Sequence, residues 1–296
     1  MNIYDCFMYY DEDLLLDIRL NALDKYVKKF VITEATYTHN GSKKKLNFNI
    51  NKFDKFKDKI EYIVVDQQPP DIKELQINDT DKIKEEKLIL NGMARDYFQR
   101  ENLSRGLKNL NDDDLIIISD LDEIPNLENF NFDKINNNII IFQQKMFYYK
   151  LNLLYDELIW TGSKAVKFKN FISPQWLRNI KSKKYPIWRL DVLFSKKKYS
   201  NLSYIKNGGW HFTCIRTPQD LEKKLLNFAH HYEFEQSGLK IEDIKKLINE
   251  KRVMYDHNID QKGYKWSGKS ILKKINLDLL PKYIGENTQK FEKWLD

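Results

Sequence analysis

The fold of this chain is decided by one stretch of sequence, Leu115-Ile116-Ile117-Ile118-Ser119-Asp120-Leu121-Asp122-Glu123-Ile124-Pro125. Four aliphatic residues without polar alternation are typical of a central strand that is covered on both faces. The strand is followed by three acids and a proline. Ligands of open α/β sheets bind outside the carboxyl ends of the strands, so this stretch predicts both the middle of a sheet and the place of a site.

Helical and β-rich segments alternate on the N-terminal side of this strand. Strands are predicted at residues 3–9, 30–33 and 62–65, and helices at residues 11–28 and 81–110. This alternation favours βαβ units and a mainly parallel central sheet flanked by helices. Short β-rich pieces follow over residues 139–209, and a helical region begins at Thr217. We therefore predict an α/β fold with one domain over residues 1–235 and a C-terminal helical extension, residues 236–296, packed on it.

The composition of the 296 residues is that of a globular protein. Apolar residues make up 42% and aromatic residues 14%, which is enough for a core and too much for a disordered chain. No apolar run approaches the roughly 18 residues of a membrane span, and the N-terminus lacks the pattern of a signal peptide. The two cysteines, Cys6 and Cys214, form neither a disulfide framework nor a CxxC metal site. We expect a cytoplasmic protein.

The chain is basic, with 50 Lys and Arg against 43 Asp and Glu and a formal charge of +7. Most lysines alternate with acids, as on a solvated surface, but three clusters are denser: Lys43–Lys45, Lys181–Lys184 and Lys196–Lys198. Such clusters attract nucleotide phosphates, acidic glycans or membrane headgroups. A peripheral membrane contact through them is therefore one expectation, whereas the sequence contains no recognised nucleic-acid module and we expect no nucleic-acid partner.

The acids that follow the strand predict a metal site. Residues two apart on an extended segment point to the same side, so Asp120 and Asp122 would converge on one cation while Glu123 points away or reaches around. Two carboxylates and ligand phosphates suit Mg²⁺ or Mn²⁺. A polar loop is the plain alternative, but three acids within four residues repel one another unless a cation or basic partners compensate. Phosphohydrolases with a nucleophilic first Asp also carry Asp-x-Asp after an apolar strand, and that alternative stays open.

Two further features carry candidate ligand-binding residues. His211 follows the pair Gly208-Gly209 and Trp210, and the glycines permit close approach of the backbone to a ligand or a sharp turn. It is a candidate third metal ligand, a diphosphate donor or a packed residue. The predicted helix before the central strand carries Arg95 and Arg100, whose guanidinium groups suit bidentate phosphate contacts, or else form a solvated basic face.

Taken together, these residues resemble glycosyltransferase family 17, the family of the β-1,4-mannosyl-glycoprotein N-acetylglucosaminyltransferase that adds the bisecting sugar. The resemblance covers most of residues 1–235 in the same order. Its specific parts are Asp-x-Asp-Glu-Ile-Pro at 120–125 and Gly-Trp-His at 209–211. It also includes residues 3–7, 14–20, 30–35, 45–46, 105–107, 114–119, Phe212, the helix 221–228, His230 and Glu233.

The resemblance implies a GT-A-type nucleotide-sugar-binding fold with a divalent metal at Asp120 and Asp122. It implies a UDP-sugar donor, with UDP-N-acetylglucosamine as the first expectation, and inversion at the anomeric carbon. Glu34, at the end of the second strand, lies where such folds often contact the nucleoside, although an ordinary strand-end acid is the alternative. We expect the acceptor to be a glycan or glycolipid outside the secretory pathway.

The expected chemistry needs a carboxylate base that takes the proton of the acceptor hydroxyl. Glu233, Glu123 and Asp191 are the candidates, in that order. Aromatic and planar groups at Trp176, Arg178, Trp188 and Trp210 are candidates for an acceptor platform, with core packing as the alternative. A third class, besides the transferase and the phosphohydrolase, is a non-catalytic protein that binds a nucleotide sugar or a carbohydrate.

Overall fold

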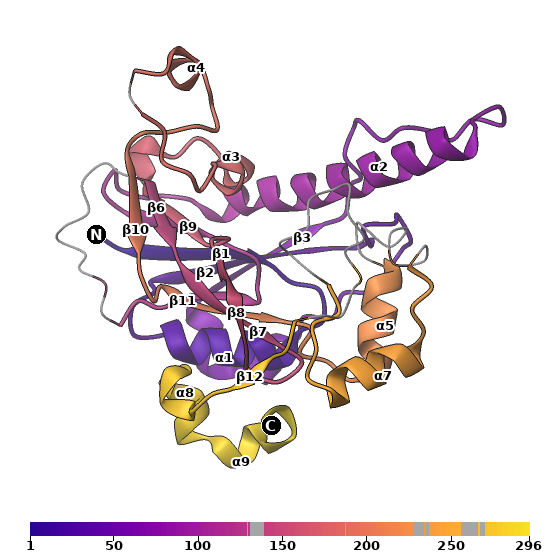
Figure 1. The fold of residues 1–296 in the computed structure, drawn as a ribbon. Coiled ribbons are helices and arrows are strands. Elements are labelled where there is room, and N and C mark those ends of the chain that lie inside the picture. The colour runs from indigo at the N-terminus through magenta and orange to yellow at the C-terminus, as the bar shows by residue number, and fades with distance from the viewer. Residues whose placement is uncertain are drawn as a thin grey trace.

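The computed structural model describes residues 1–128, 130, 139–186, 188–227, 234, 237–255, 266 and 270–296. Within these residues the chain forms two sheets with helices around them (Figure 1). The first sheet has the strand order β10-β6-β9-β4-β1-β2-β3. Its strands are β1 (Ile3–Met8), β2 (Lys29–Ala35), β3 (Ile60–Val65), β4 (Leu115–Ile118), β6 (Ile139–Phe142), β9 (Lys164–Lys167) and β10 (Leu202–Ile205).

The first sheet is mainly parallel, as predicted. β1 pairs in parallel with β2 and β4, β2 with β3, and β6 with β10, while β9 runs antiparallel between β4 and β6. β4 is fully buried, and its alternate side chains enter two different cores. Leu115 and Ile117 pack in the core that contains Leu16, and Ile116 and Ile118 pack in the core that contains Leu177. The prediction of a central strand covered on both faces is confirmed.

The second sheet was not predicted. Its strand order is β12-β8-β7-β11-β5, and only the pair β7–β11 is parallel. Its strands are β5 (Glu123–Pro125), β7 (Gln144–Tyr148), β8 (Leu153–Trp160), β11 (Gly209–Thr213) and β12 (Lys273–Lys274). β5 and β12 are too short to give a periodic signal. β8 has exposed residues on both sides of its pleat after Tyr155, so its sequence does not alternate cleanly.

The helices are α1 (Asp13–Leu23), α2 (Asp81–Glu101), α3 (Pro174–Asn179), α4 (Leu190–Leu193), α5 (Pro218–Asn227), α7 (Ile241–Asn249), α8 (Lys282–Glu286) and α9 (Thr288–Phe291). α2 is followed by a 3₁₀ turn, Asn102–Gly106, so the helix predicted to residue 110 ends earlier. Gly106 is needed there, because a Cβ would lie 2.5 Å from Val31. Among the described residues, no helix is both long enough and apolar enough to span a bilayer.

The C-terminal part joins the rest of the molecule closely. β12 extends the second sheet beside β8, and α8 packs near α1 (Figure 1). It therefore contributes a strand as well as short helices. The division of the chain at residue 235 stays a prediction.

Candidate functional site

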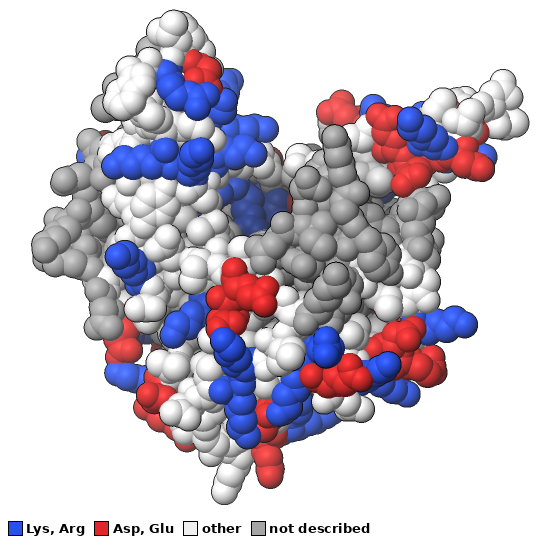
Figure 2. Space-filling view, viewed as in Figure 1, with Lys and Arg blue, Asp and Glu red and all other residues white. Residues whose placement is uncertain are grey.

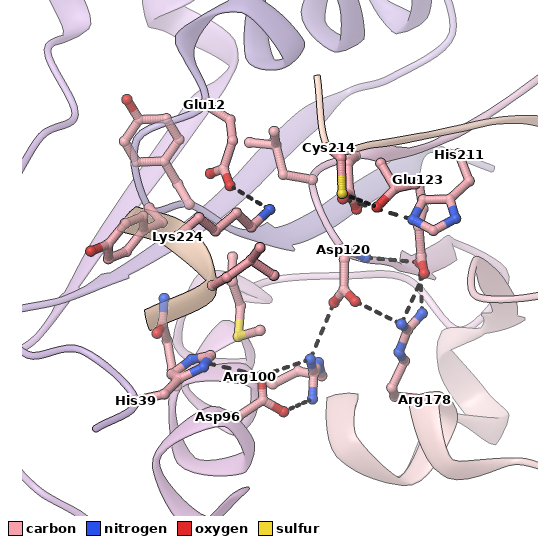
Figure 3. Close-up of a pocket in the computed structure, with 18 of the residues that line it drawn as sticks. Glu12, His39, Asp96, Arg100, Asp120, Glu123, Arg178, His211, Cys214 and Lys224 are labelled. Atoms are coloured by element: carbon pink, nitrogen blue, oxygen red, sulfur yellow. Dashed lines mark hydrogen bonds and ion pairs between the residues drawn. The ribbon is translucent and has the colours of Figure 1, made fainter. Parts of the chain in front are cut away.

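A pocket of about 1170 Å³ lies where β1 and β4 end. Figure 3 shows its charged lining, which comes from segments far apart in sequence. α2 provides Asp96 and Arg100, α3 provides Arg178, β11 provides His211 and α5 provides Lys224. The acids after β4 meet these side chains at the predicted edge of the sheet.

A tight turn, rather than the extended segment we expected, carries the acids after β4. The amide of Glu123 donates to the carbonyl of Asp120 at 3.0 Å, and the amide of Asp120 donates to Oε2 of Glu123 at 3.0 Å. Buried Arg19 donates to the carbonyls of Asp120, Leu121 and Glu123 at 2.9, 3.1 and 3.0 Å, while its other nitrogens bind Asp5. The three hydrogen bonds from Arg19 thus fix the backbone of the turn.

Two arginines hold the carboxylate of Asp120. Nη2 of Arg178 lies 2.7 Å from Oδ2, and Nη2 of Arg100 lies 3.1 Å from Oδ1. Burial alone would raise the pKa of Asp120, but the charges of Arg178 and Arg100 outweigh it and hold this pKa well below its usual range. Arg100 is held in turn by Asp96, four residues earlier on α2.

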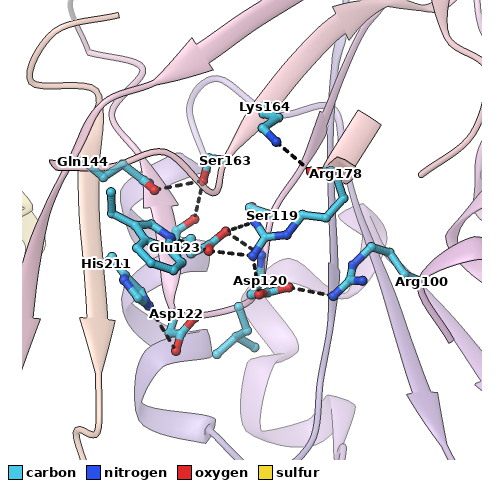
Figure 4. A network of polar contacts seen from close by, with 12 residues as sticks. Arg100, Ser119, Asp120, Asp122, Glu123, Gln144, Ser163, Lys164, Arg178 and His211 are labelled. Atoms are coloured by element: carbon cyan, nitrogen blue, oxygen red, sulfur yellow. Dashed lines mark hydrogen bonds and ion pairs between the residues drawn. The ribbon is translucent and has the colours of Figure 1, made fainter. Parts of the chain in front are cut away.

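Glu123 is buried and its two oxygens are occupied (Figure 4). Oε2 accepts from Nη1 of Arg178 at 2.6 Å, and Oε1 accepts from Nη2 of Arg178 at 2.9 Å and from Nε1 of Trp160 at 2.5 Å. Gly162 leaves room for the carboxylate, because a Cβ there would lie 1.9 Å from Oε1. This geometry favours a positioning role for Glu123, which fixes Arg178, over the general-base role that the sequence suggested.

Asp122 and His211 face each other across a gap that is open to the pocket. Oδ2 of Asp122 lies 3.7 Å from Nε2 of His211, which is too long for a hydrogen bond. The ring of His211 stacks on Trp160, with the centroids 4.5 Å apart. Its Nδ1 is buried and has no hydrogen-bond partner among the described residues. An oxygen and a nitrogen at this spacing fit two ligands of one divalent cation.

No cluster of three or more His, Cys, Asp or Glu side chains suited to a metal is found in the described part of the chain. A cation between Asp122 and His211 would therefore complete its shell with water and ligand phosphates, as Mg²⁺ usually does.

The predicted close approach at Gly208 and Gly209 occurs, but to protein backbone. A Cβ on Gly209, whose φ is +133°, would lie 2.1 Å from the carbonyl of Ile124.

The negative charges of the side chains that line the pocket outnumber the positive charges. Among the described residues they are five carboxylates (Glu12, Asp96, Asp120, Asp122, Glu123) and three cations (Arg100, Arg178, Lys224). With neutral histidines the lining has a net charge of −2. An anionic ligand would enter such a pocket unfavourably unless a cation accompanied it.

Two residues predicted to bind the nucleotide, Glu34 and Arg95, lie elsewhere in the structure. The buried carboxylate of Glu34 accepts from Lys44, from the Tyr62 hydroxyl at 2.7 Å and from two backbone amides, and it does not line the pocket. Arg95 donates to Gln68 at 2.8 Å and to the carbonyl of His39 at 3.0 Å, outside the lining. Both are structural contacts in this arrangement.

Asp191 lies on α4, away from the pocket, and is paired with Arg189 and Lys198. Trp188 and Trp210 are not in the pocket lining, and neither is Trp176, which donates to Tyr199 at 3.0 Å. Of the predicted acceptor platform, the structure brings only Arg178 to the pocket. Glu233 lies outside the described residues.

Sequence reasoning missed Asp96, Trp160 and Lys224. Asp96 had a readable signal, since it precedes Arg100 by four residues on a predicted helix and such pairs share a face. Trp160 and Lys224 had none, because their place at the pocket depends on the second sheet and on α5.

The chain is similar to known glycosyltransferases. Residues 1–295 match the model of glycosyltransferase family 17. The beta-1,4-mannosyl-glycoprotein 4-beta-N-acetylglucosaminyltransferases of Homo sapiens and Rattus norvegicus are each 30% identical to the chain over 115 residues. That stretch is 38% of this chain and 19% of each relative, so the match spans about a fifth of the relatives' length. Because the family model matches almost every residue, the chain belongs to glycosyltransferase family 17.

Proposed function

We propose that the chain is a metal-dependent, inverting glycosyltransferase with a GT-A-type fold. Its donor is a UDP-sugar, UDP-N-acetylglucosamine first, and its acceptor is a hydroxyl of a glycan or glycolipid. Family membership supports transfer of a sugar, and the names of the relatives support N-acetylglucosamine. The observation that carries metal dependence is the pocket with a net charge of −2, in which Asp122 faces His211.

Asp122 and His211 would hold the divalent ion, Mn²⁺ or Mg²⁺. Such an ion supplies charge neutralisation to a departing diphosphate. Asp120, expected as a further ligand, has one contact to an arginine on each oxygen. Each carboxylate oxygen has two lone pairs, so Asp120 can still accept a hydrogen bond from a hydroxyl of the nucleotide sugar or from a water. Arg178 and Arg100 fix the orientation in which it does so.

Inversion requires that the acceptor oxygen forms its bond to the anomeric carbon as the bond from that carbon to the diphosphate oxygen breaks. The acceptor proton passes to a carboxylate, and UDP leaves. Glu123 is poorly suited to take the proton, because donors occupy both of its oxygens. Glu233 therefore remains the first candidate for the base.

A phosphohydrolase with Asp120 as nucleophile is less compatible with the geometry. Both oxygens of Asp120 contact guanidinium groups, which lower its basicity and hold it in place. A binding protein without turnover is distinguished from a transferase by experiment.

The test is a thermal-shift panel of UDP-, GDP- and CMP-sugars, each with Mn²⁺ or EDTA, followed by an assay of UDP release. We expect stabilisation by UDP-N-acetylglucosamine that needs metal and is lost in Asp122→Asn and in His211→Ala. Asp191→Asn, a matched change outside the pocket, should respond like the wild type. Stabilisation without UDP release from any acceptor or water would indicate a binding protein, and no response to any nucleotide sugar would contradict the proposal.

A further inference from the structure

Residues 181–186 and 188–199, here called the basic arm, leave the body of the molecule as a protrusion. The amide of Lys181 donates to the carbonyl of Lys197 at 2.8 Å, and the amide of Tyr185 donates to the carbonyl of Tyr199 at 3.2 Å. These two hydrogen bonds join the two sides of the arm. The Tyr204 hydroxyl fixes its base by donating to the carbonyl of Ser182 at 2.9 Å. Figure 1 shows α4 at the far end of the arm, held away from both sheets.

Almost all of the excess charge of the chain lies on the basic arm. It contains seven basic residues and one acid, a net charge of +6, against +7 for the whole chain. Figure 2 shows Lys and Arg atoms gathered on the upper-left protrusion, where Figure 1 shows α4. Lys183, Lys184, Lys196 and Lys197 are exposed, and none of them forms an ion pair with another described residue. This charge is therefore available to an anionic partner.

Large apolar side chains stand exposed between these cations. The exposed fractions of Trp188, Leu190 and Phe194 are 83%, 72% and 89%. Three such residues within seven positions, on a segment that extends into solvent, have no packing role in the described structure. Exposed apolar groups rimmed by polar ones mark a surface that contacts a protein or a membrane.

We propose that the basic arm docks the protein on an anionic lipid bilayer, with Trp188, Leu190 and Phe194 entering the interface and the lysines at the headgroups. Aromatic and aliphatic tips flanked by Lys and Arg suit an interface that is apolar on one side and negatively charged at its surface. A protein partner fits less well, because lysine is depleted from protein interfaces. A nucleic acid would contact the lysines, but it would leave the exposed Leu190 without an apolar contact.

The arm begins three residues after Arg178 of the pocket. Nζ of Lys164 donates to the carbonyls of Arg178 at 2.6 Å and of Ile180, the residue directly before the arm, at 2.5 Å, and so holds the segment between the pocket and the arm. A bound membrane would therefore lie on the side of the molecule where α3 borders the pocket, as an acceptor linked to lipid requires. This consequence rests on the proposed function, whereas membrane binding itself does not.

The test is cosedimentation of the full chain with vesicles of phosphatidylcholine alone or with about 30% phosphatidylglycerol, at roughly 50 and 500 mM salt. We expect binding that needs the anionic lipid and weakens at high salt. Lys183→Glu with Lys184→Glu should weaken it at least about tenfold, since each basic residue near the surface adds attraction. Lys245→Glu with Lys246→Glu on α7, the same change of charge on exposed lysines elsewhere, should bind like the wild type.

The apolar contribution is tested separately. Phe194→Ser should weaken vesicle binding, whereas Ile77→Ser, at another fully exposed apolar residue, should not. Brominated lipids should quench tryptophan fluorescence of the wild type and quench that of Trp188→Phe less. Thermal unfolding of every variant shows whether it is folded. Equal binding to neutral and anionic vesicles, equal losses in the two lysine pairs, or binding to RNA without binding to vesicles would overturn the proposal.

Discussion

Replacing Glu123 by Gln tests whether this residue holds the site together or performs its chemistry. The side chain is fully buried, and its carboxylate accepts from Arg178 twice, from Trp160 and from the amide of Asp120. A Gln amide would remove the charge that faces Arg178 and would point an NH₂ group at one of these donors. Breaking a buried ion pair by removing one partner costs about 3–5 kcal/mol. We therefore expect the free energy of unfolding to fall by about 3–5 kcal/mol.

The assay is urea unfolding followed by tryptophan fluorescence, with UDP release measured on the same samples. If Glu123 positions Arg178, stability and turnover fall together, and the affinity for the nucleotide falls with them. If Glu123 were the base, turnover would fall while stability and nucleotide affinity stayed at wild-type values. That second result would refute the structural role argued here.

Asp191→Asn is the matched control, because Asp191 was also a candidate base. Its side chain is 43% exposed and pairs with Arg189 and Lys198 at the surface. Exposed ion pairs contribute at most about 1 kcal/mol, so stability should change little. A large loss of turnover in this variant would show that the basic arm reaches the reaction.

Three further predictions address the surroundings of the site. Gly162→Ala should lower the free energy of unfolding in urea by about 1–3 kcal/mol, because its Cβ would collide with Glu123, whereas Gly285→Ala, with open space around it, should not. Burial, and then the charge of Arg178, lower the pKa of Lys164 to about 7. Between about pH 7 and pH 10 the unfolded chain thus holds a proton that the folded chain lacks, so stability rises with pH, and Lys164→Met should remove that part of the rise. UDP should bind much more weakly in EDTA than in Mn²⁺ by calorimetry, whereas uridine, which has no phosphate, should bind equally in both; equal UDP affinities would contradict the charge argument.

The centre of the fold could be predicted because its signals are local. β4 is a continuous aliphatic run, and β1, β2 and β3 are short apolar segments. A helical spacing separates β1 from β2, and the pair Pro69-Pro70 follows β3. The second sheet could not be predicted in the same way. β11 lies between β7 and β5, which precede it by some 60 and 80 residues, so the pairing depends on contacts that no short window contains.

The predicted site residues divide by the same principle. Asp120 and Asp122 reach the pocket because they follow the end of β4, whereas His211 reaches it from the middle of β11. Glu34 also lies near the end of a strand, but the loop after β2 returns and supplies Lys44 and two amides to its carboxylate. Arg95 lies one turn before Arg100 on α2, yet it contacts the loop at His39 instead of the pocket. The residue type and the strand end were readable, whereas the partner that takes up each charge was not.

The distribution of those partners also indicates where the proposed cation would bind. Three acids within four residues need compensation, and the structure supplies it unequally. Arg178 and Arg100 bind Asp120, and Arg178 binds Glu123 as well. Asp122 forms no ion pair with a described lysine or arginine: His211 lies 3.7 Å away, and Lys224, which pairs with Glu12, acts on Asp122 only through its charge. The charge of Asp122 is therefore the least compensated of the three. A divalent ion at Asp122 would bring the lining from −2 to neutral, and only then does a diphosphate enter without net repulsion. If the proposed function holds, a metal would thus be needed already for binding of the donor, before any step of the transfer.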